Sequence, residues 1–503
     1  MKYFRILSTS FFVLFTLAVT AQNEDSLAVK ITDKEDAVRV FQHSLFRNPA
    51  NYLHFRDYSL TEFRIDNSSN NTNAHLAQQG QNQHFFNVGA DAYHKQGNSA
   101  MWGSASYKQG KRENVQWNES ADYDKIFPYV VADSVGGAIN YEHYRFDGGY
   151  VQQLGTYSIG ISGFYQAQLE YREVDPRPKN IAAFFGLELG VTKTFNSKIS
   201  LSLNTGIEKY TQKHKMSFYN PMGFPTIYQL NGMGNYNSLL KGKRKEAYYE
   251  GWTYSVGLQL YEAQKRNWFI TGAIRTFAFE KLLPEFYDLQ ASTAKDTEYE
   301  GSAGKLWDYQ QMSFGVLLDG RIKERRGTEN LFVNQSTENY ITIGEVERYK
   351  YRENTAKISG LWKLSGTANT YSATPFLAFR QTTEHYKTPF SETDIRYMTY
   401  GLQGQWLHTF KNNSILTTRA NWAVTNITHD TAHFSFSNSN AINQMLLDNY
   451  KFQTSDNWTT TLNLRYSFPI PEIINAFVGL DYSYQHYSLG NNNSLLGSIG
   501  ILF

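Results

Sequence analysis

The sequence predicts an all-β fold, namely a transmembrane antiparallel up-and-down β-barrel of about 16 to 18 strands. Three observations predict it. Segments in which apolar and polar side chains alternate recur from about residue 51 to the end. Aromatic residues make up 16% of the chain, although its mean hydropathy is only −0.51. The last segment also alternates, and it ends in the aromatic Phe503.

Residues 157–172 show the alternation most clearly. Odd positions from Tyr157 to Tyr171 are mostly apolar, whereas even positions from Ser158 to Arg172 are mostly polar or small. A barrel wall faces lipid on one side and water on the other, and a period of two provides both faces. At a rise of about 3.3 Å per residue the segment reaches roughly 50 Å, so we expect it to project beyond a bilayer.

The connections between these segments alternate between short and long. Sequences such as Gln96-Gly97-Asn98 and Lys411-Asn412-Asn413 predict tight periplasmic turns. External loops are predicted at roughly 67–83, 110–137, 173–180, 216–245, 283–304, 385–395 and 430–449. Residues 323–352 are ambiguous, because Lys323 to Gly327 fits either a turn or a strand. We favour 18 strands over 16, and an even number places both chain ends in the periplasm.

The composition agrees with such a barrel and excludes other classes. The 36 Tyr, 34 Phe and 9 Trp are expected in girdles at the two membrane interfaces. No run after residue 21 approaches the 18 apolar residues of a helical span. The absence of cysteine excludes disulfides and the lipid-modified cysteine of a lipoprotein.

The start of the chain predicts export. Lys2 and Arg5 precede a mostly apolar stretch at 6–19, and a cut is expected between Ala21 and Gln22. Removal of residues 1–21 lowers the formal net charge from +2 to 0, which argues against a nucleic-acid partner. We therefore expect a signal peptide at 1–21, an N-terminal periplasmic or lumen segment at 22–50 and a barrel at 51–503. The expected location is the cell outer membrane.

The segment at 22–50 is too short for the plug of an energised TonB-dependent transporter, so we expect a TonB-independent protein. Ala37, Val38, Phe41 and Leu45 have helical spacing, which predicts a short amphipathic helix in the lumen.

Two resemblances to known families are present. Asn48-Pro49-Ala50 resembles the end of the N-terminal hatch in the long-chain fatty-acid channel family; the alternative is a turn that starts a strand. The signal end at Ala21-Gln22, the loops 127–137 and 175–180 and the closing Phe503 resemble a bacteroidete-type outer-membrane β-barrel family of unknown function. This resemblance implies fold and location and no activity. Phe503 also resembles the C-terminal signal that the barrel-assembly machinery reads.

No motif nominates an enzyme, a cofactor or a metal site, and catalysis stays uncertain. His429 and His433 would suit a metal only if their segment were helical; solvated loop histidines are the alternative. Asp122, Asp124 and Asp133 would suit calcium, with ordinary loop acids as the alternative. The basic cluster at 241–245 suits lipopolysaccharide phosphates or simple solvation.

The lumen is the remaining candidate site. Charged residues on the polar face of the ladders are expected to point inward, where both signs of charge are present. These candidates are Glu170, Arg172, Glu188, Glu208, Arg275, Asp319, Arg321, Arg465 and Asp481. Their expected roles are pairing across strands, which keeps the wall rigid, or contact with a solute.

The function expected from these patterns is that of a passive channel or transport-associated pore for a small solute. The alternative is a surface binding or assembly partner of another outer-membrane complex, such as an importer, a lipoprotein or secretion machinery. Expected partners are outer-membrane lipid and lipopolysaccharide, the barrel-assembly machinery through Phe503, and a surface lipoprotein or importer, with no nucleic acid.

Overall fold

The computed structural model describes residues 27–221, 223, 225–242, 246–336, 339–470 and 474–503. The expected signal peptide and its cleavage point lie outside the described residues. Within the described ranges, none of the helices is both long and apolar enough to cross a membrane.

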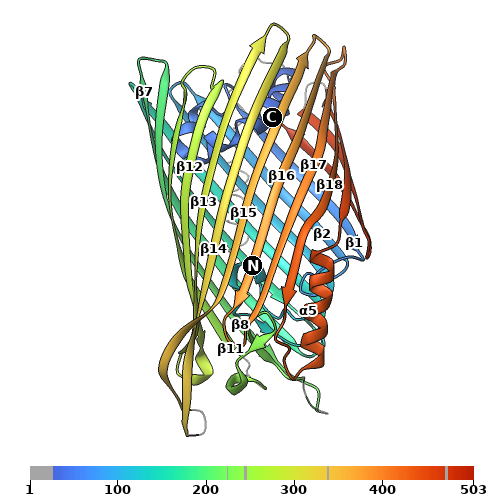
Figure 1. Cartoon of the computed structure of the whole chain (residues 1–503). Coiled ribbons are helices and arrows are strands. Elements are labelled where there is room, and N and C mark those ends of the chain that lie inside the picture. Colours follow the sequence, from blue (N-terminus) through green and yellow to red (C-terminus); the bar gives the residue numbers. More distant parts are fainter. Residues whose placement is uncertain (1–26, 222, 224, 243–245, 337–338, 471–473) are drawn as a thin grey trace, which may run out of the picture.

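Eighteen antiparallel strands form one closed sheet in which each strand pairs with its neighbours along the chain, and β1 pairs with β21 to complete the ring (Figure 1). The predicted fold class and the favoured strand number are confirmed. The strands are β1 (Leu60–Thr72), β2 (Gln83–Gln96), β3 (Ser99–Val115), β5 (Gly137–Leu154), β6 (Tyr157–Tyr171), β7 (Arg177–Phe195), β8 (Ile199–Ser217), β11 (Glu246–Glu262), β12 (Trp268–Leu283), β13 (Leu289–Tyr309), β14 (Met312–Ser336), β15 (Asn339–Ser365), β16 (Asn369–Tyr386), β17 (Ser391–Thr409), β18 (Ile415–His433), β19 (Asn457–Ile470), β20 (Ile474–Tyr487) and β21 (Gly490–Leu502).

Side chains alternate across the wall as the sequence predicts. In β6 the exposed Ile159 and Ile161 face outward, whereas Ser158 and Gln168 are buried. In β7 the outward apolar positions run from Ile181 to Val191. That span is about 33 Å along the strand and, at a tilt near 40°, roughly 25 Å across the barrel, which matches the thickness of an apolar membrane band.

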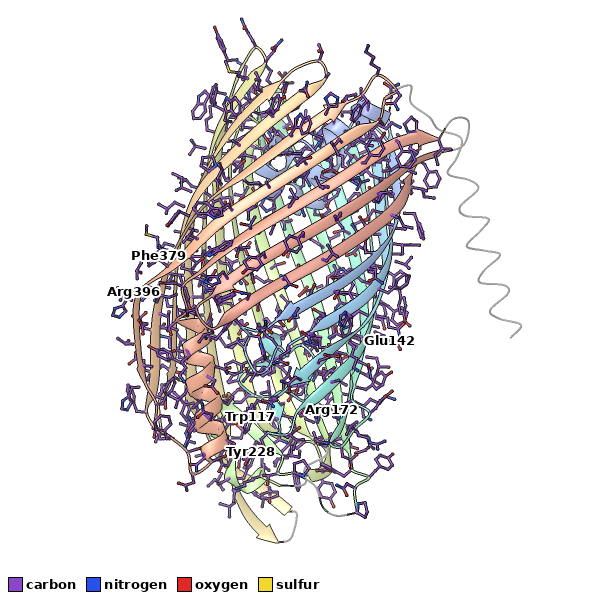
Figure 2. All side chains as sticks on the ribbon, turned by 90° about the vertical axis from the view of Figure 1, so that its right-hand side faces the viewer. Trp117, Glu142, Arg172, Tyr228, Phe379 and Arg396 are labelled. Atoms are coloured by element: carbon purple, nitrogen blue, oxygen red, sulfur yellow. The ribbon has the colours of Figure 1, made fainter. Side chains whose placement is uncertain are left out.

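The outer surface changes character beyond this band. Figure 2 shows Phe379 on the outside of the barrel, with the charged Arg396 and Glu142 also outside. The strands therefore extend past the apolar band and present charge to water.

Two sequence predictions about loops are wrong. The expected loop at 283–304 is mostly strand β13. Lys323 to Gly327, which fitted either a turn or a strand, lies inside β14. The segment that carries His429 and His433 is the end of β18, not a loop. These stretches are polar because they lie beyond the apolar band, and polarity there does not indicate a loop.

The two ends of the barrel differ. At one end, which we call the short-turn end, brief connections such as those at Gly97 and Gly155 join the strands. Strand β1 begins and strand β21 ends at this end of the barrel. At the long-loop end the connections carry α4 (Tyr123–Ile126), β4 (Val131–Ala132), β9 (Tyr228–Gly232), β10 (Asn235–Tyr236), η3 (Ser238–Leu240), η4 (Pro284–Phe286) and α5 (Asn440–Gln453). Strands β4, β9 and β10 form a small separate sheet.

The described residues before β1 form α2 (Leu27–Lys34), α3 (Ala37–Phe41), η1 (His43–Arg47) and η2 (Pro49–His54). They lie at the short-turn end, at the top of Figure 1. We call residues 27–59 the hatch.

Candidate functional site

The hatch packs against the inner wall through apolar side chains. Phe41 and Leu45 pack with Tyr261, Phe269 and Leu306 of the wall. Two other buried clusters contact different arcs of the wall. The first joins Ala28 and Ile31 to Leu407, Ile415, Phe477 and Leu502, and the second joins Leu53 to Tyr93, Ala100 and Val151. Because the three clusters reach separate arcs, the hatch spans the lumen.

Asn51 is the polar anchor of the hatch and is only 3% exposed. Its Oδ1 accepts hydrogen bonds from Thr192 Oγ1 at 2.7 Å, Ser202 Oγ at 3.0 Å and Tyr261 OH at 2.8 Å. Its Nδ2 donates to Gln259 Oε1 and to the Leu45 carbonyl, both at 2.7 Å. The side chain thus joins the hatch to three strands, β7, β8 and β11, with all its polar capacity used.

Two glycines of the wall make room for η2. A Cβ at Gly160 would lie 2.4 Å from the carbonyl carbon of Pro49, and one at Gly190 would lie 2.0 Å from Asn48 Oδ1. Asn48 Oδ1 accepts from the Ala50 N–H at 2.9 Å, which caps the start of η2. The Asn48-Pro49-Ala50 segment therefore fits a recess that only glycine permits. Its resemblance to the fatty-acid channel hatch stays a prediction.

Ion pairs also join the hatch to the wall. Lys363 Nζ lies 2.5 Å from Asp36 Oδ2. Three further pairs with the wall are Lys34 with Glu62, Glu35 with Arg419, and Arg47 with Glu300. Most of these groups are partly buried, where a charge without its partner is costly.

Burial, followed by the positive charges of Arg266 and Lys95, lowers the pKa of His54 in η2 to about 4. His54 is therefore neutral at neutral pH.

A second closure lies at the long-loop end. Residues 116–136, which we call the plug loop, fold inward, and Trp117, Ile126 and Tyr129 are buried in the largest apolar cluster. Figure 2 shows Trp117 and Tyr228 inside the lower end of the barrel, where their ring centroids lie 5.9 Å apart. Tyr249 OH donates to the Tyr129 carbonyl at 2.9 Å.

Arg325 of β14 holds helix α4 of the plug loop. Its Nε and Nη2 donate to the two carboxylate oxygens of Asp296 at 2.5 and 2.6 Å. Its other N–H groups donate to the carbonyls of Asp124, Lys125 and Phe127 at the C-terminal end of α4. A cation is favourable there because the helix dipole places partial negative charge at that end.

A buried charge cluster fixes the base of the plug loop. Arg172 Nη2 lies 2.7 Å from Glu119 Oε1, and Arg172 Nη1 lies 3.5 Å from Asp133 Oδ2. Burial, followed by the neighbouring Asp133, raises the pKa of Glu119 above its usual range. Two carboxyl groups therefore share one guanidinium at the base of the plug loop.

Inside the barrel, against the hatch, lies a chamber of about 820 Å³ that hatch and wall residues line. Its wall carries both signs of charge, with Arg64, Arg145 and Arg275 facing Asp91 and Glu188. Aromatic rings from the hatch and wall complete the lining, and Tyr52 stacks on Trp102 at 4.3 Å between centroids. A second cavity of about 570 Å³ borders Glu62 and Arg64 on the β1 side.

Five of the nine predicted lumen residues line these two cavities. Glu188, Glu208 and Arg275 line the chamber, where Arg275 Nη2 lies 2.7 Å from Glu208 Oε1. Arg465 and Asp481 line the second cavity. Arg465 Nη2 lies 2.9 Å from Glu62 Oε2, and Asp481 accepts from Asn463 at 2.8 Å.

The other four lie elsewhere in the barrel. Glu170 pairs with Arg112 at 2.5 Å, and Arg172 belongs to the base of the plug loop, near the lower end of Figure 2. Asp319 accepts from Ser302 at 2.6 Å. Arg321 pairs with Glu298 and, at 3.5 Å, with Glu353. The contacts of these four residues join strands to one another or to the plug loop.

The loop candidates separate in the structure. Asp122 accepts from Tyr210 at 3.3 Å, and Asp133 accepts from the N–H groups of residues 135 and 136. Across the described residues, no group of three or more His, Asp or Glu side chains is arranged to hold a metal. Of the basic cluster at 241–245, only residues 241 and 242 fall within the described ranges.

Sequence reasoning missed the two residues that hold the closures, Asn51 and Arg325. Asn51 directly follows the Asn-Pro-Ala segment, which was the available signal for a special backbone there. Arg325 stood in a charged run that fits a turn equally well, so its sequence offered no signal.

Comparison with solved structures finds large barrels at low sequence identity. The copper transporter OprC is 6% identical with a TM-score of 0.43, and 89% of this chain and 82% of that chain are covered. The FrpB iron transporter from Neisseria meningitidis is 9% identical with a TM-score of 0.40 and coverages of 91% and 83%. A BenF-like porin from Pseudomonas fluorescens Pf-5 is 10% identical with a TM-score of 0.35 and coverages of 89% and 98%.

A comparison with curated proteins found no match. Residues 49–503, which include η2 and every strand of the barrel, match a single protein family. The chain belongs to the family of unknown function DUF6850.

Proposed function

We propose that this protein is an outer-membrane β-barrel that works as a TonB-independent, passive transport pore for a small solute, closed at both ends in its resting state. The observation that carries the proposal is the chamber of about 820 Å³, which is lined by polar and aromatic side chains of the wall and by the hatch, while the plug loop folds into the lumen at the other end. A barrel that served only as an anchor would need neither a chamber nor two closures.

The closures differ in a way that suits gating. The hatch is held by short apolar contacts, one asparagine and exchangeable ion pairs, and it belongs to no strand of the wall. The plug loop is held by buried charges and a large apolar cluster. Elements that move are drawn from the less stable parts of a fold, so the hatch is the expected moving part.

Conductance across planar bilayers tests the proposal. We expect a low conductance for the mature chain and a clear increase when residues 22–59, which include the whole hatch, are deleted together with replacement of residues 117–135 by a short Gly-Ser connection. Heat-modifiable migration on gels checks that the barrel still folds. A folded double variant that conducts no ions would overturn the proposal.

The alternative is a surface binding or assembly partner of another outer-membrane complex. Beyond Glu329, β14 no longer pairs with β13, and before Tyr349, β15 does not pair with β16. The β14–β15 hairpin therefore extends past its neighbours, at the bottom of Figure 1, and exposes Val333 and Ile343. Purification from native membranes tests this alternative, because a stable associate lost on truncation of the hairpin would favour it over a pore.

A further inference from the structure

A third cavity, of about 290 Å³, lies at the long-loop end and is separate from the chamber. The plug loop, the loop with β9, the ends of β14 to β17 and helix α5 all contribute to its wall. Exposed Asp124 and Gln453 stand at its border, so it is open to water. Nothing in the proposed pore requires a cavity in this place.

Aromatic rings form much of this wall, namely those of Tyr123, Phe127, Tyr349, Tyr351, Phe434 and Tyr450. Three of the tyrosine hydroxyls are already engaged. Tyr349 OH donates to Glu384 Oε1 at 3.1 Å, Tyr351 OH to Glu353 at 3.0 Å, and Tyr450 OH to Asp430 at 2.7 Å. The rings, more than the hydroxyls, are therefore what a ligand would contact.

The positive charges at this cavity are neutralised by the protein itself. All five N–H groups of Arg325 have acceptors, and Lys323 Nζ lies 3.6 Å from Asp296 Oδ2. The acidic side chains, in contrast, have oxygens that can accept further hydrogen bonds. Glu384 Oε2 and both carboxylate oxygens of Asp124 receive no hydrogen bond from the residues that the structure describes.

The loop that closes one side is shaped tightly around this space. Gly232, Met233 and Gly234 all have positive φ, at 101°, 47° and 76°. A Cβ at Gly232 would lie 2.8 Å from the Tyr349 ring, and one at Gly234 would lie 2.5 Å from Leu446 Cδ1. Such backbone is unfavourable for most residues, and it keeps the cavity wall in one shape.

We infer that this cavity binds a small organic cation, an amine with an apolar or aromatic body. Aromatic faces attract a cation within about 6 Å of the ring centre. Burial raises the pKa of Glu384 to about 7, so its carboxyl group is ionised at pH 8, where its second oxygen supplies the charge-assisted hydrogen bond. The volume suits a compact ligand of this kind. Binding here does not require the lumen to open, so the inference stands apart from the proposed function.

Calorimetric titration of the full mature chain in detergent tests the inference. Three probes of similar size share a phenylethyl body and differ in their polar group, which is cationic, neutral or anionic: phenethylammonium, 2-phenylethanol and 3-phenylpropionate. We expect phenethylammonium to bind about tenfold more tightly than the alcohol, because a charged hydrogen bond and cation–π contacts are added. Equal binding of amine and alcohol, tighter binding of the carboxylate, or no binding of any probe would overturn the inference.

Variants assign the effect to Glu384. Glu384→Gln should abolish the preference for the amine, whereas Glu392→Gln, which alters an exposed carboxylate at the same end of the barrel, should preserve it. Tyr349→Phe keeps the ring and frees the second oxygen of Glu384, so the amine should bind at least as tightly. A preference for the amine that survives Glu384→Gln would place its cause elsewhere and refute this site.

Discussion

Replacing Asn51 by alanine should release the hatch. The substitution removes five hydrogen bonds that join η2 to Leu45 and to four side chains of the wall. Thr192 and Ser202 can still bond to each other at 2.7 Å, but Tyr261 OH and Gln259 Oε1 lose this partner in a buried place. The bonds to Leu45, Gln259 and Tyr261 are the ones that are not replaced, and at about 1–1.5 kcal/mol each the cost is about 3–5 kcal/mol.

A cost of that size raises the ratio of undocked to docked hatch by about a hundredfold to several thousandfold. The chain has no cysteine, so one introduced thiol can report this ratio. Ser44 in η1 is 4% exposed and its Oγ has no hydrogen-bond partner among the described residues, which makes Ser44→Cys a mild change. When the hatch recloses faster than the thiol reacts, the maleimide labelling rate follows the undocked population.

We therefore expect Asn51→Ala in the Ser44→Cys background to label at least a hundredfold faster than the background alone. Asn71→Ala, at an exposed position of β1, is the matched control and should leave the rate unchanged. A rise of less than tenfold, or an equal rise in the control, would show that Asn51 does not hold the hatch.

Three further predictions concern the closures. Acid should raise the labelling rate of the same thiol relative to that of a free thiol at the same pH, since only the thiolate reacts. This ratio should rise as pH falls from about 6.5 toward 4, because the lowered pKa of His54 means that docking stability is present above 6.5 and is lost on protonation; His54→Gln should weaken this dependence. Gly160→Val should displace the hatch and speed labelling, since its Cβ would lie 2.4 Å from the backbone of Pro49, whereas Gly497→Ala, with no atom within 4 Å, should not. Arg325→Ala should expose residues 116–136 to limited proteolysis and lower the free energy of unfolding by about 3–5 kcal/mol. Arg325→Lys should not restore protection, because lysine cannot make the bidentate contact with Asp296. Full protection in both variants would refute the assigned role.

The sequence predicted the wall of the barrel well because the physical constraint on it is local. Each strand must alternate, as from Tyr157 to Tyr171, and this pattern is visible without knowing the neighbouring strand. The favoured count of 18 strands followed from turns such as Gly97 and Gly155. The predictions about the signal peptide and the fatty-acid channel resemblance stay predictions.

Prediction from the sequence did not identify strands where they extend beyond the apolar band. In β13 and β14 the outward residues become polar near Thr297 and Glu324, so the alternation between lipid and water disappears although the hydrogen-bonded ladder continues. The ladder is maintained there by pairing with the next strand, including the contact between Asp296 and Arg325. A pattern read along one strand does not contain that information.

The alternation of side chains along each strand was therefore sufficient to predict the barrel fold, since hydrocarbon outside and water inside impose a period of two on every strand. Only the tertiary structure decided that the hatch and the plug loop fold into the lumen, because Asn51 meets Gln259 and Tyr261, and Arg325 meets Asp124 and Phe127, across about two hundred residues of chain. Those contacts arise when the sheet closes and brings distant side chains into one space. Their energy depends on burial and hydrogen-bond geometry, which no local run of residues specifies.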